Sequence, residues 1–372
     1  MSAVRGMPAV PPMAADAGVQ PLVLQPPDIA ECVALAARSF EEFERGEAMV
    51  RAWFDARVLA NPWQHRLPGI GVGLRCEGEL VAFRAMFAQP WWLEGASTVA
   101  AFAAHTAVDP RRRGQGLGTA LIDASRAFAR ISGSTSAGVV TQKSYARLGF
   151  AAIGGRDSGF HRVRASYVGS LQRRFGGTLG RVLGAPLDLL LVRRERSALA
   201  TGRLRLEELT HCDDEVERLW LRCRATQRSC LERGSRYLDW RLFEQPTAPL
   251  RLAALRGAAG TLRALAVWTT ERYDEHVSSA VLRDLLWADE DSAALPAMLH
   301  ALLAHWRALG HAWASLEVTS PRLARCWREL GCEAVPSKGN RYWIHAAPPL
   351  APSTLEAWIR SGLDGDYGDV GA

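Results

Sequence analysis

Apolar and polar residues alternate along the first half of the chain in the pattern of a sheet covered by helices. Two alternating stretches, 71–76 and 80–87, are separated by a Glu-Gly turn and predict a β-hairpin. Small and β-branched residues over 99–108 predict a central strand. That strand should end before Pro110, because proline has no N–H to donate to a ladder.

Helical periodicity surrounds these strands. Apolar residues recur every three or four positions in four further segments, and a short apolar run lies between two of them. The predicted helices are 29–40, 46–59, 118–131 and 144–148, and the predicted strand is 136–140. Strands that alternate with helices indicate an α/β fold with its ligand at the carboxyl ends of the strands.

The second half of the chain repeats the first. The phrase Asp-x-Arg-aliphatic-x-x-amide-Pro occurs around Arg57 and again around Arg241, at an offset of 184 residues. A Leu-Gly pair occurs at Gly149 and again at Gly331, at an offset of 182 residues. A near-constant offset over about 90 residues indicates an internal duplication. The second copy is predicted to contain strands 250–255, 262–269, 279–287 and 312–318 and helices 292–309 and 322–330.

This duplication predicts two tandem α/β domains, at 21–165 and 201–347. Residues 1–20 contain Ala, Pro and Gly but lack the apolar core of a signal peptide, so we expect a disordered leader there. Residues 348–372 are expected to form a C-terminal tail.

The linker 166–200 contains an apolar run at 187–192 between arginines. Such a segment can be an amphipathic helix at a membrane surface or a helix packed between the two domains, and we favour the second interpretation. Pro186 is expected to break or cap the helix that forms there.

Composition narrows the functional class. Hydrophobic residues make up 48% of the 372 residues and charged residues 23%, as in ordinary globular proteins. The net charge of +6 comes mainly from scattered arginines, without a basic run interleaved with aromatic residues. We therefore expect no nucleic-acid partner, and interpret the charge as favouring anionic ligands.

Cysteine usage and hydropathy exclude further classes. The seven cysteines form neither a CxxC pair nor the Cys/His spacing of a zinc site, so no metal is expected. An odd number of cysteines without a signal peptide suggests reduced thiols in a cytoplasmic protein. No stretch approaches about eighteen uninterrupted apolar residues, which argues against stable membrane insertion.

One loop carries the clearest chemistry. The string Arg113-Gly-Gln-Gly-Leu-Gly118 lies between the predicted central strand and the helix that follows it. Glycines let the backbone approach an anion, and the free N–H groups at the start of a helix point toward it. A Walker A loop would end in Gly-Lys-Ser/Thr, and a dinucleotide-binding loop would follow the first strand, whereas this loop does neither. The predicted cofactor-binding residues are Val108, Arg113, Gly114, Gln115, Gly116, Leu117, Gly118 and Thr119.

The full string resembles motif A of the GCN5-related N-acetyltransferases (GNAT), Arg/Gln-x-x-Gly-x-Gly/Ala. Arg113, Gly116 and Gly118 match that motif. The Val-Asp-Pro string before the loop and the string Tyr145-x-x-x-Gly-Phe after it are also similar to the family.

The resemblance covers residues 22–155 well and residues 200–347 in outline. It implies two tandem acyl-CoA N-acyltransferase-like domains, each a mixed, mostly antiparallel central sheet flanked by helices. It also implies that acetyl-CoA, or another acyl-CoA, is the co-substrate, and that its pantetheine arm lies like an extra strand between two splayed strands.

The resemblance further places a proton-donating tyrosine just before the Leu-Gly-Phe element, which is Tyr145 here. The alternative is that the Tyr145 ring only packs beneath the cofactor, and Thr141 or Gln142 replaces the asparagine that the family commonly has before the helix. His105, three residues before the strand end, is the expected base, because imidazole titrates near neutrality. The alternative for His105 is a hydrogen-bonded histidine of the strand.

The second copy lacks the glycine loop. In its place stands Ala-Asp-Glu-Asp-Ser at 288–292, whose three carboxylates would repel a diphosphate. Asp284 stands 179 residues after His105, which leaves a substrate-facing role open. We therefore expect a degenerate second domain, and one cofactor site per chain in the N-terminal half.

The sequence thus predicts an N-acetyltransferase that transfers an acyl group directly from acyl-CoA to a primary amine of a small molecule or peptide. Acetyl is the expected acyl group. Glu41 and Glu42, near the end of the first predicted helix, are alternative residues to receive the substrate ammonium. Two other classes stay open: an acyl-CoA-binding regulatory module without catalysis, and a tRNA-dependent aminoacyl transferase, against which the intact loop argues. A homodimer also stays open.

Overall fold

The computed structural model forms two compact units, and each is described by itself. The described residues are 19–39, 46–135, 137–153, 160–199, 204–244, 249–272, 277–288, 291–318, 320–335 and 342–365. The first unit comprises Met1–Trp91, Thr98–Ile153 and Gly339–Ala351, and the second comprises Trp92–Ser97, Gly154–Lys338 and Pro352–Ala372.

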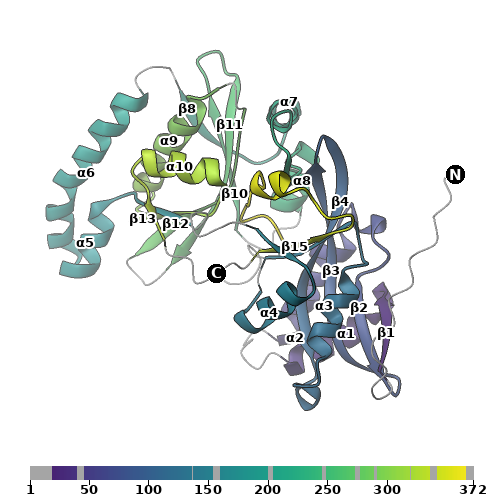
Figure 1. Ribbon diagram of the computed structural model, residues 1–372. Coiled ribbons are helices and arrows are strands. Elements are labelled where there is room, and N and C mark those ends of the chain that lie inside the picture. The colour runs from purple at the N-terminus through teal and green to yellow at the C-terminus, as the bar shows by residue number, and fades with distance from the viewer. Residues whose placement is uncertain are drawn as a thin grey trace. The chain divides into compact units, whose positions relative to one another are not determined.

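The first unit is a mixed sheet flanked by helices (Figure 1). Along the sheet the strands are β1 (Val19–Leu24), β2 (Gly71–Cys76), β3 (Glu79–Leu93), β4 (Ala96–Val108), β5 (Ile131–Ser134), β15 (Trp343–Ala346) and β6 (Ala151–Ala152). Strands β1, β2 and β3 pair in antiparallel fashion, whereas β4 and β5 are parallel. The helices are α1 (Ile29–Ser39), α2 (Gly46–Phe54), α3 (Leu117–Ser125) and α4 (Val139–Arg147).

Helix α3 lies against the sheet because its apolar residues fall on one side. Leu117, Leu121 and Ala124 are buried in a cluster with Val72 and Met86 of the sheet. Burial of a leucine side chain stabilises a fold by about 1.5–3 kcal/mol, so this face fixes the start of α3 relative to the strands.

The second unit repeats this order of elements. Along its sheet the strands are β14 (Glu333–Ala334), β7 (His161–Arg164), β13 (Trp313–Leu316), β12 (Ser278–Trp287), β11 (Leu262–Arg272), β10 (Arg251–Arg256) and β8 (Arg205–Leu209). The helices are α5 (Tyr167–Phe175), α6 (Gly177–Leu199), α7 (Asp214–Arg224), α8 (Ser235–Asp239), α9 (Ala294–Ala308), α10 (Pro321–Glu329) and α11 (Pro352–Glu356), and a further short strand is β9 (Ser229–Leu231). Both units have the predicted fold class, a mixed and mostly antiparallel sheet with flanking helices.

The repeated Asp-x-Arg phrase has the same structure in both units. Each copy forms a single π-helical turn, Asp55–Leu59 in the first unit and Trp240–Glu244 in the second. The arginine in each turn is almost completely buried, with 1% of its surface exposed at Arg57 and at Arg241. A rare turn with a buried charge at matching positions supports the internal duplication.

The two copies exchange a strand. Strand β7 follows the first copy in the sequence but pairs with β13 and β14 of the second sheet. Strand β15 follows the second copy but pairs with β5 and β6 of the first sheet. The compact units therefore differ from the predicted continuous stretches 21–165 and 201–347 by this exchange, and the second unit also includes Trp92–Ser97, the predicted linker 166–200 and the residues from Pro352 on.

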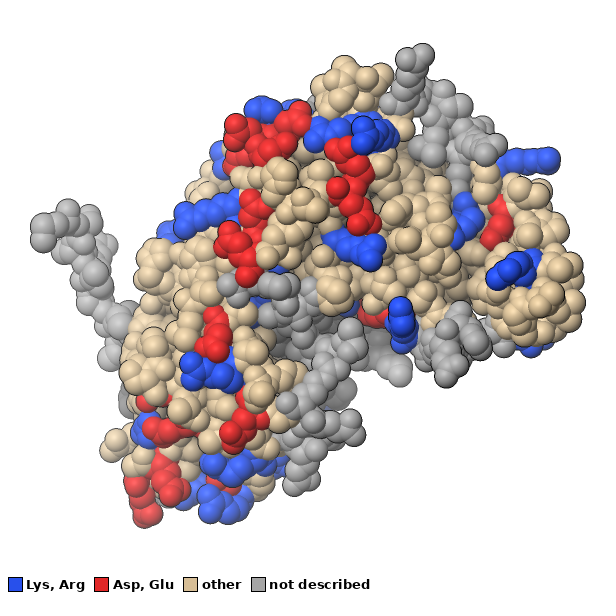
Figure 2. Space-filling view, turned by 180° about the vertical axis from the view of Figure 1, so that it is seen from behind, with Lys and Arg blue, Asp and Glu red and all other residues tan. Residues whose placement is uncertain are grey.

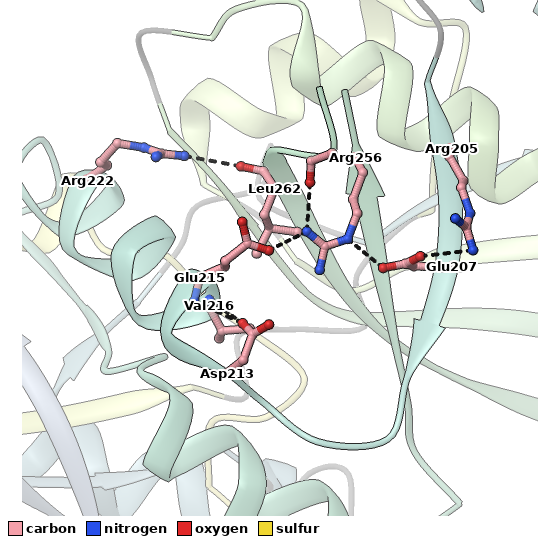
Figure 3. A network of polar contacts seen from close by, with 9 residues as sticks. Arg205, Glu207, Asp213, Glu215, Val216, Arg222, Arg256 and Leu262 are labelled. Carbon is pink, nitrogen blue, oxygen red and sulfur yellow. Dashed lines mark hydrogen bonds and ion pairs between the residues drawn. The ribbon is translucent and has the colours of Figure 1, made fainter. Parts of the chain in front are cut away.

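An arginine-centred network joins three elements of the second unit (Figure 3). Arg256 of β10 donates through Nε to Glu207 of β8 at 2.5 Å and also binds Glu215 of α7. Asp213 caps α7 by accepting from the backbone N–H of Glu215 at 2.9 Å. Shared charged hydrogen bonds of this kind hold α7 against the edge of the sheet.

Two predicted elements of the first unit are wrong. The helix predicted over 118–131 ends at Ser125, whose hydroxyl bonds back to the Ile122 carbonyl at 2.7 Å. The strand lies at Ile131–Ser134 instead of 136–140, since both its neighbours, β4 and β15, offer backbone partners there. Val139 and Val140 are β-branched, which favours a strand, but they form the start of helix α4. The backbone pairing available at 131–134 thus decides where the strand forms.

The expectation for Pro186 is also wrong. Helix α6 continues through this proline from Gly177 to Leu199. Pro186 is exposed, and so is Val182, whose carbonyl lacks the usual N–H partner at position 186. Water can satisfy that carbonyl on the open side of the helix.

Two surface properties bear on the class of protein. None of the helices in the described ranges combines the length and apolar character needed to cross a membrane. On the face seen in Figure 2, basic and acidic side chains are interspersed, with neither sign gathered over the whole face.

Candidate functional site

The first unit splits its sheet next to the glycine loop. Strands β4 and β5 pair in parallel only where Ala100–Phe102 face Ile131–Gly133. Strand β5 ends at Ser134, whereas β4 continues to Val108. The last residues of β4 therefore run on without the sheet neighbour that β5 provides earlier.

The start of the loop is a capped turn. Asp109 accepts from the backbone N–H of Arg111 at 2.9 Å and from its guanidinium at 2.8 and 3.0 Å. The Arg111 guanidinium lowers the pKa of the Asp109 carboxyl to about 2. Asp109 is therefore ionised at neutral pH and holds the turn Pro110–Arg112 in place.

The end of α1 holds both sides of the loop. The Ser39 hydroxyl donates to the Val108 carbonyl at 3.2 Å, and the Ser39 carbonyl accepts from Arg113 Nη2 at 2.5 Å. Val108 and Arg113, both predicted to contact the cofactor, are thus fixed to the same residue. Their positions relative to the strand end are set by the fold before any ligand binds.

The glycines leave open space over the backbone. Gly114 and Gly116 have φ of +82° and +80°, values that an L-residue rarely adopts. A Cβ atom at Gly114, Gly116 or Gly118 would meet no described heavy atom within 4 Å. An anion can therefore approach the main chain closely at all three residues.

Helix α3 begins at the same place. It starts at Leu117 with Gly116 as its N-cap, so the first N–H groups of the helix have no acceptor within it. These N–H groups and the helix dipole favour a phosphate there. The open glycines and the helix start together form a place that suits a phosphate group.

Two residues predicted to bind the cofactor have other uses for their side chains. Leu117 has 6% of its surface exposed and packs in the core, so only its backbone N–H is available to a ligand. The Thr119 hydroxyl lies 2.9 Å from that of Ser144 and joins α3 to α4. Gln115 is exposed.

Tyr145 lies deep beside the splayed strands. It is fully buried, and its ring lies between Phe150, at 4.7 Å between centroids, and Trp343, stacked at 5.9 Å. Its hydroxyl receives a hydrogen bond from Arg84 Nη2. The exchanged strand β15 thus supplies one wall of the tyrosine's surroundings.

Arg84 is a site residue that the sequence reasoning missed. It lies in β3 with 2% of its surface exposed, and its Nη1 donates to the Thr106 hydroxyl of β4 at 2.9 Å. Its Nε has no hydrogen-bond partner among the described residues. The sequence offered one signal for this residue, a single arginine within the apolar run 81–87, which the structure shows to be buried. A buried arginine requires hydrogen-bond partners, and such partners often belong to a site.

His105 stands next to Thr106 in an unusual conformation. Its φ of +44° falls in the left-handed region, which costs a non-glycine residue about 1–2 kcal/mol. The half-buried ring packs edge to face on Trp53, at 4.6 Å between centroids. His105 and Tyr145 are therefore connected through Thr106 and Arg84, whereas Glu41 and Glu42 lie outside the described residues.

The same place in the second unit is occupied by the chain itself. Strands β12 and β13 pair over Ser279–Leu282, and the Arg283 carbonyl then accepts from the Gly362 N–H at 2.6 Å. A Cβ atom on Gly362 would lie 2.8 Å from the Arg283 side chain and 2.9 Å from Glu317. The C-terminal segment therefore lies against β12 where the sheet splits.

Charges in this part of the second unit are paired internally. Asp284, the counterpart of His105, is buried and bound by Arg233 at 2.6 Å. Arg283 binds Glu317, whose pKa is raised to about 7 by burial. Asp291 is bound by Arg263, while Asp289 and Glu290 lie outside the described residues. Asp284 is therefore not placed to face a substrate of the second unit.

Comparisons with known proteins identify a related domain and fold. The family described as acetyltransferase (GNAT) domain matches residues 72–152, which include the loop, His105 and Tyr145. A comparison with curated proteins found no match.

Solved structures share the fold over most of the chain. A GCN5-related N-acetyltransferase from Anabaena variabilis has a TM-score of 0.58 at 15% identity, over 88% of this chain and 72% of that one. A GCN5-related N-acetyltransferase from Kribbella flavida has a TM-score of 0.53 at 17% identity, over 88% and 70%. The N-myristoyltransferase of Saccharomyces cerevisiae, solved with bound myristoyl-CoA, has a TM-score of 0.51 at 11% identity, over 90% and 84%.

These findings support acyl transfer from an acyl-CoA as the general activity. Residues 72–152 match the acetyltransferase (GNAT) domain, in a chain that folds as two tandem acyltransferase-like domains.

Proposed function

We propose that the first unit is an N-acetyltransferase that transfers acetyl from acetyl-CoA directly to a primary amine of a small molecule or peptide. The observation that carries this proposal is the open backbone at Gly114, Gly116 and Gly118 beside the free start of α3. That arrangement suits a diphosphate, and the splayed β4 offers backbone groups to the pantetheine arm.

The residues have separate roles in the proposed reaction. The loop from Arg113 to Thr119 binds the diphosphate through backbone N–H groups. The backbone at the end of β4, from Thr106 to Val108, polarises the thioester carbonyl by hydrogen bonding. The amine nitrogen attacks that carbonyl carbon, and the carbon–sulfur bond breaks.

Two proton transfers complete the step. His105 removes a proton from the amine, directly or through a water molecule. Tyr145 gives its hydroxyl proton to the departing thiolate. Arg84 is a positioning residue: its Nη2 donates to the Tyr145 oxygen, so the phenolic hydrogen is directed elsewhere.

A binding and turnover experiment tests this proposal. Calorimetry with acetyl-CoA and intact-mass analysis of an amine panel incubated with labelled acetyl-CoA measure the two properties separately. We expect binding and acetylation of at least one amine. Failure to bind acetyl-CoA would remove the cofactor assignment.

One observation favours a second candidate, an acyl-CoA-binding module without catalysis. Tyr145 is fully buried, and the His105 ring packs on Trp53, as expected of residues with structural roles. Binding without turnover on any amine would support the module. Replacement of Tyr145 by Phe separates the two, since it should slow an enzyme by about a hundredfold but leave a binding module's affinity unchanged.

A further inference from the structure

The α5–α6 hairpin of the second unit packs with its small residues inward. A Cβ atom on Gly180 would lie 2.3 Å from the backbone nitrogen of Gln172, and one on Gly184 would lie 2.6 Å from the Cα atom of Val168. Only glycine fits at both positions, so α6 meets α5 backbone to backbone. This mode of packing needs no large apolar residue at the contact.

The single acidic residue between Arg174 and Arg193 also faces inward. Asp188 accepts from the Ser166 hydroxyl and from the Tyr167 backbone N–H, both at 2.6 Å. Asp188 thereby caps the start of α5, and its charge is used within the hairpin.

The large apolar residues of α6 are turned outward. Of the eleven large hydrophobic residues that are exposed in the described part of the chain, seven fall between positions 175 and 190. They are Phe175 (45% exposed), Leu179 (53%), Val182 (65%), Leu183 (45%), Leu187 (38%), Leu189 (62%) and Leu190 (60%). Phe175 is the last residue of α5, and the six on α6 fall within an arc of about 160° around the helix, which leaves out Gly180 and Gly184. In Figure 2 the end of the second unit formed by this hairpin, at the right, is mostly tan.

Exposed arginines stand at both ends of this apolar side. Arg174 precedes Phe175 at the end of α5 and Arg193 lies on the apolar side of α6, whereas Arg181 lies on the other side of the helix. No exposed acidic residue lies between positions 174 and 193. A second copy of the chain would bring arginines against arginines, which is unfavourable. A partner with an anionic surface layer over an apolar interior can bind both groups, because the arginines contact the anionic layer and the leucines enter the apolar interior.

We propose that the outer side of α6 binds the surface of an anionic lipid bilayer. The leucines enter the boundary between headgroups and acyl chains, and the arginines contact lipid phosphates. The helix lies along the surface and does not cross the bilayer, in keeping with its length and composition. The proposal does not depend on the activity of the first unit.

Co-sedimentation of the full chain with lipid vesicles tests this proposal. Vesicles of phosphatidylcholine with 30% phosphatidylglycerol, taken as roughly the anionic content that attracts basic segments, are compared with pure phosphatidylcholine. We expect sedimentation with the anionic vesicles, weakened by salt, and little with the neutral ones. Equal or absent sedimentation with both would overturn the proposal.

Matched variants locate the surface. Val182→Gln with Leu190→Gln should lower the partition coefficient by about tenfold, since each change removes buried apolar area. Leu309→Gln, with 47% exposure at the end of α9, is the control and should leave it unchanged. Arg193→Gln should weaken binding to anionic vesicles by about fivefold and reduce its salt dependence.

Two measurements keep these outcomes distinguishable. Circular dichroism melting should show that each variant folds, and acetyl-CoA affinity should be the same in all of them. If the double variant binds vesicles as the wild type does, the proposal fails. If it instead converts a dimer to a monomer in analytical ultracentrifugation, the surface binds a second copy and not lipid.

Discussion

Strands β4 and β12 occupy equivalent places in the two copies but end in different surroundings. Both strands lose a parallel partner at the same point, after Phe102 in the first copy and Leu282 in the second. In the first copy the strand leads to open glycines and a helix start. In the second, Gly362 binds the strand and carboxylates pair with arginines. The same fold thus offers unused backbone groups in one copy and satisfies its polar groups internally in the other.

The buried charges of the second copy contribute to stability, whereas the open groups of the first copy are available to a ligand. A buried ion pair that loses one partner destabilises a protein by about 3–5 kcal/mol, because the remaining charge stays buried. The second copy contains such a pair in Arg233 and Asp284. The first copy has a histidine at that position and a buried Arg84 whose Nε has no hydrogen-bond partner among the described residues. Substitutions at matching positions should therefore have different consequences in the two copies.

The largest expected effect is at the loop. Gly116→Glu should abolish acetyl-CoA binding, because it adds a carboxylate at the anion site and a side chain at a φ of +80°. Calorimetry measures the affinity, and circular dichroism checks that the fold remains. The matched control in the second copy is Ser292→Glu, an exposed position in the equivalent segment, which should leave affinity unchanged. Retained affinity in Gly116→Glu would remove the loop assignment.

The next effect is on stability and belongs to the second copy. Asp284→Ala should lower the free energy of unfolding by about 3–5 kcal/mol, because it leaves Arg233 buried without its carboxylate. Urea denaturation measures this change. His105→Ala at the matching position of the first copy should change stability by much less. Similar losses for the two variants would contradict the assigned difference between the copies.

His105→Ala should act on the reaction instead. We expect kcat to fall by roughly tenfold to a thousandfold at neutral pH, because the proposed base is lost. The pH profile of kcat/KM in wild type and variant is the measurement. If the variant keeps the acidic limb of the profile, another group removes the proton.

The smallest effect is expected at Asp109. Its pKa is lowered to about 2, so its ionised form stabilises the folded state. This contribution is present above the ordinary aspartate pKa and is lost as the pH falls through about 2. Asp109→Asn should therefore cost less than about 1 kcal/mol at pH 7, because its partner Arg111 is mostly exposed. Urea denaturation at several pH values should show the two proteins converging in acid, and a constant difference would contradict this origin.

Much of the fold follows from local patterns. The strand 71–76 is found at Gly71–Cys76, and the predicted pair of amphipathic helices before it is present as α1 and α2. The loop glycines could be identified because both their backbone conformation and the helix after them depend on nearby residues. The duplication could be inferred from the repeated Asp-x-Arg phrase and Leu-Gly pair, and the structure shows that the repeated arginine is buried in a π-helical turn of each copy.

Long-range pairing accounts for the rest. No local pattern indicates that β15 will pair with β5, or that Trp343 will stack on Tyr145. Arg84 appears in the sequence as one charge in an apolar strand, and its partners Thr106 and Tyr145 come from other elements. The role of Gly362 also depends on a contact with a distant strand. Such features arise from the whole fold.

The exchanged strand has a consequence for synthesis of the chain. The N-terminal copy emerges from the ribosome long before Trp343–Ala346 are synthesised. These residues nevertheless form the strand between β5 and β6 in the first sheet. Until then β5 presents unpaired backbone groups at an edge, the kind of surface that favours association with other chains. The first sheet can therefore be completed only after the whole second copy has been made, so a chain cut before Trp343 would leave the edge of β5 unpaired.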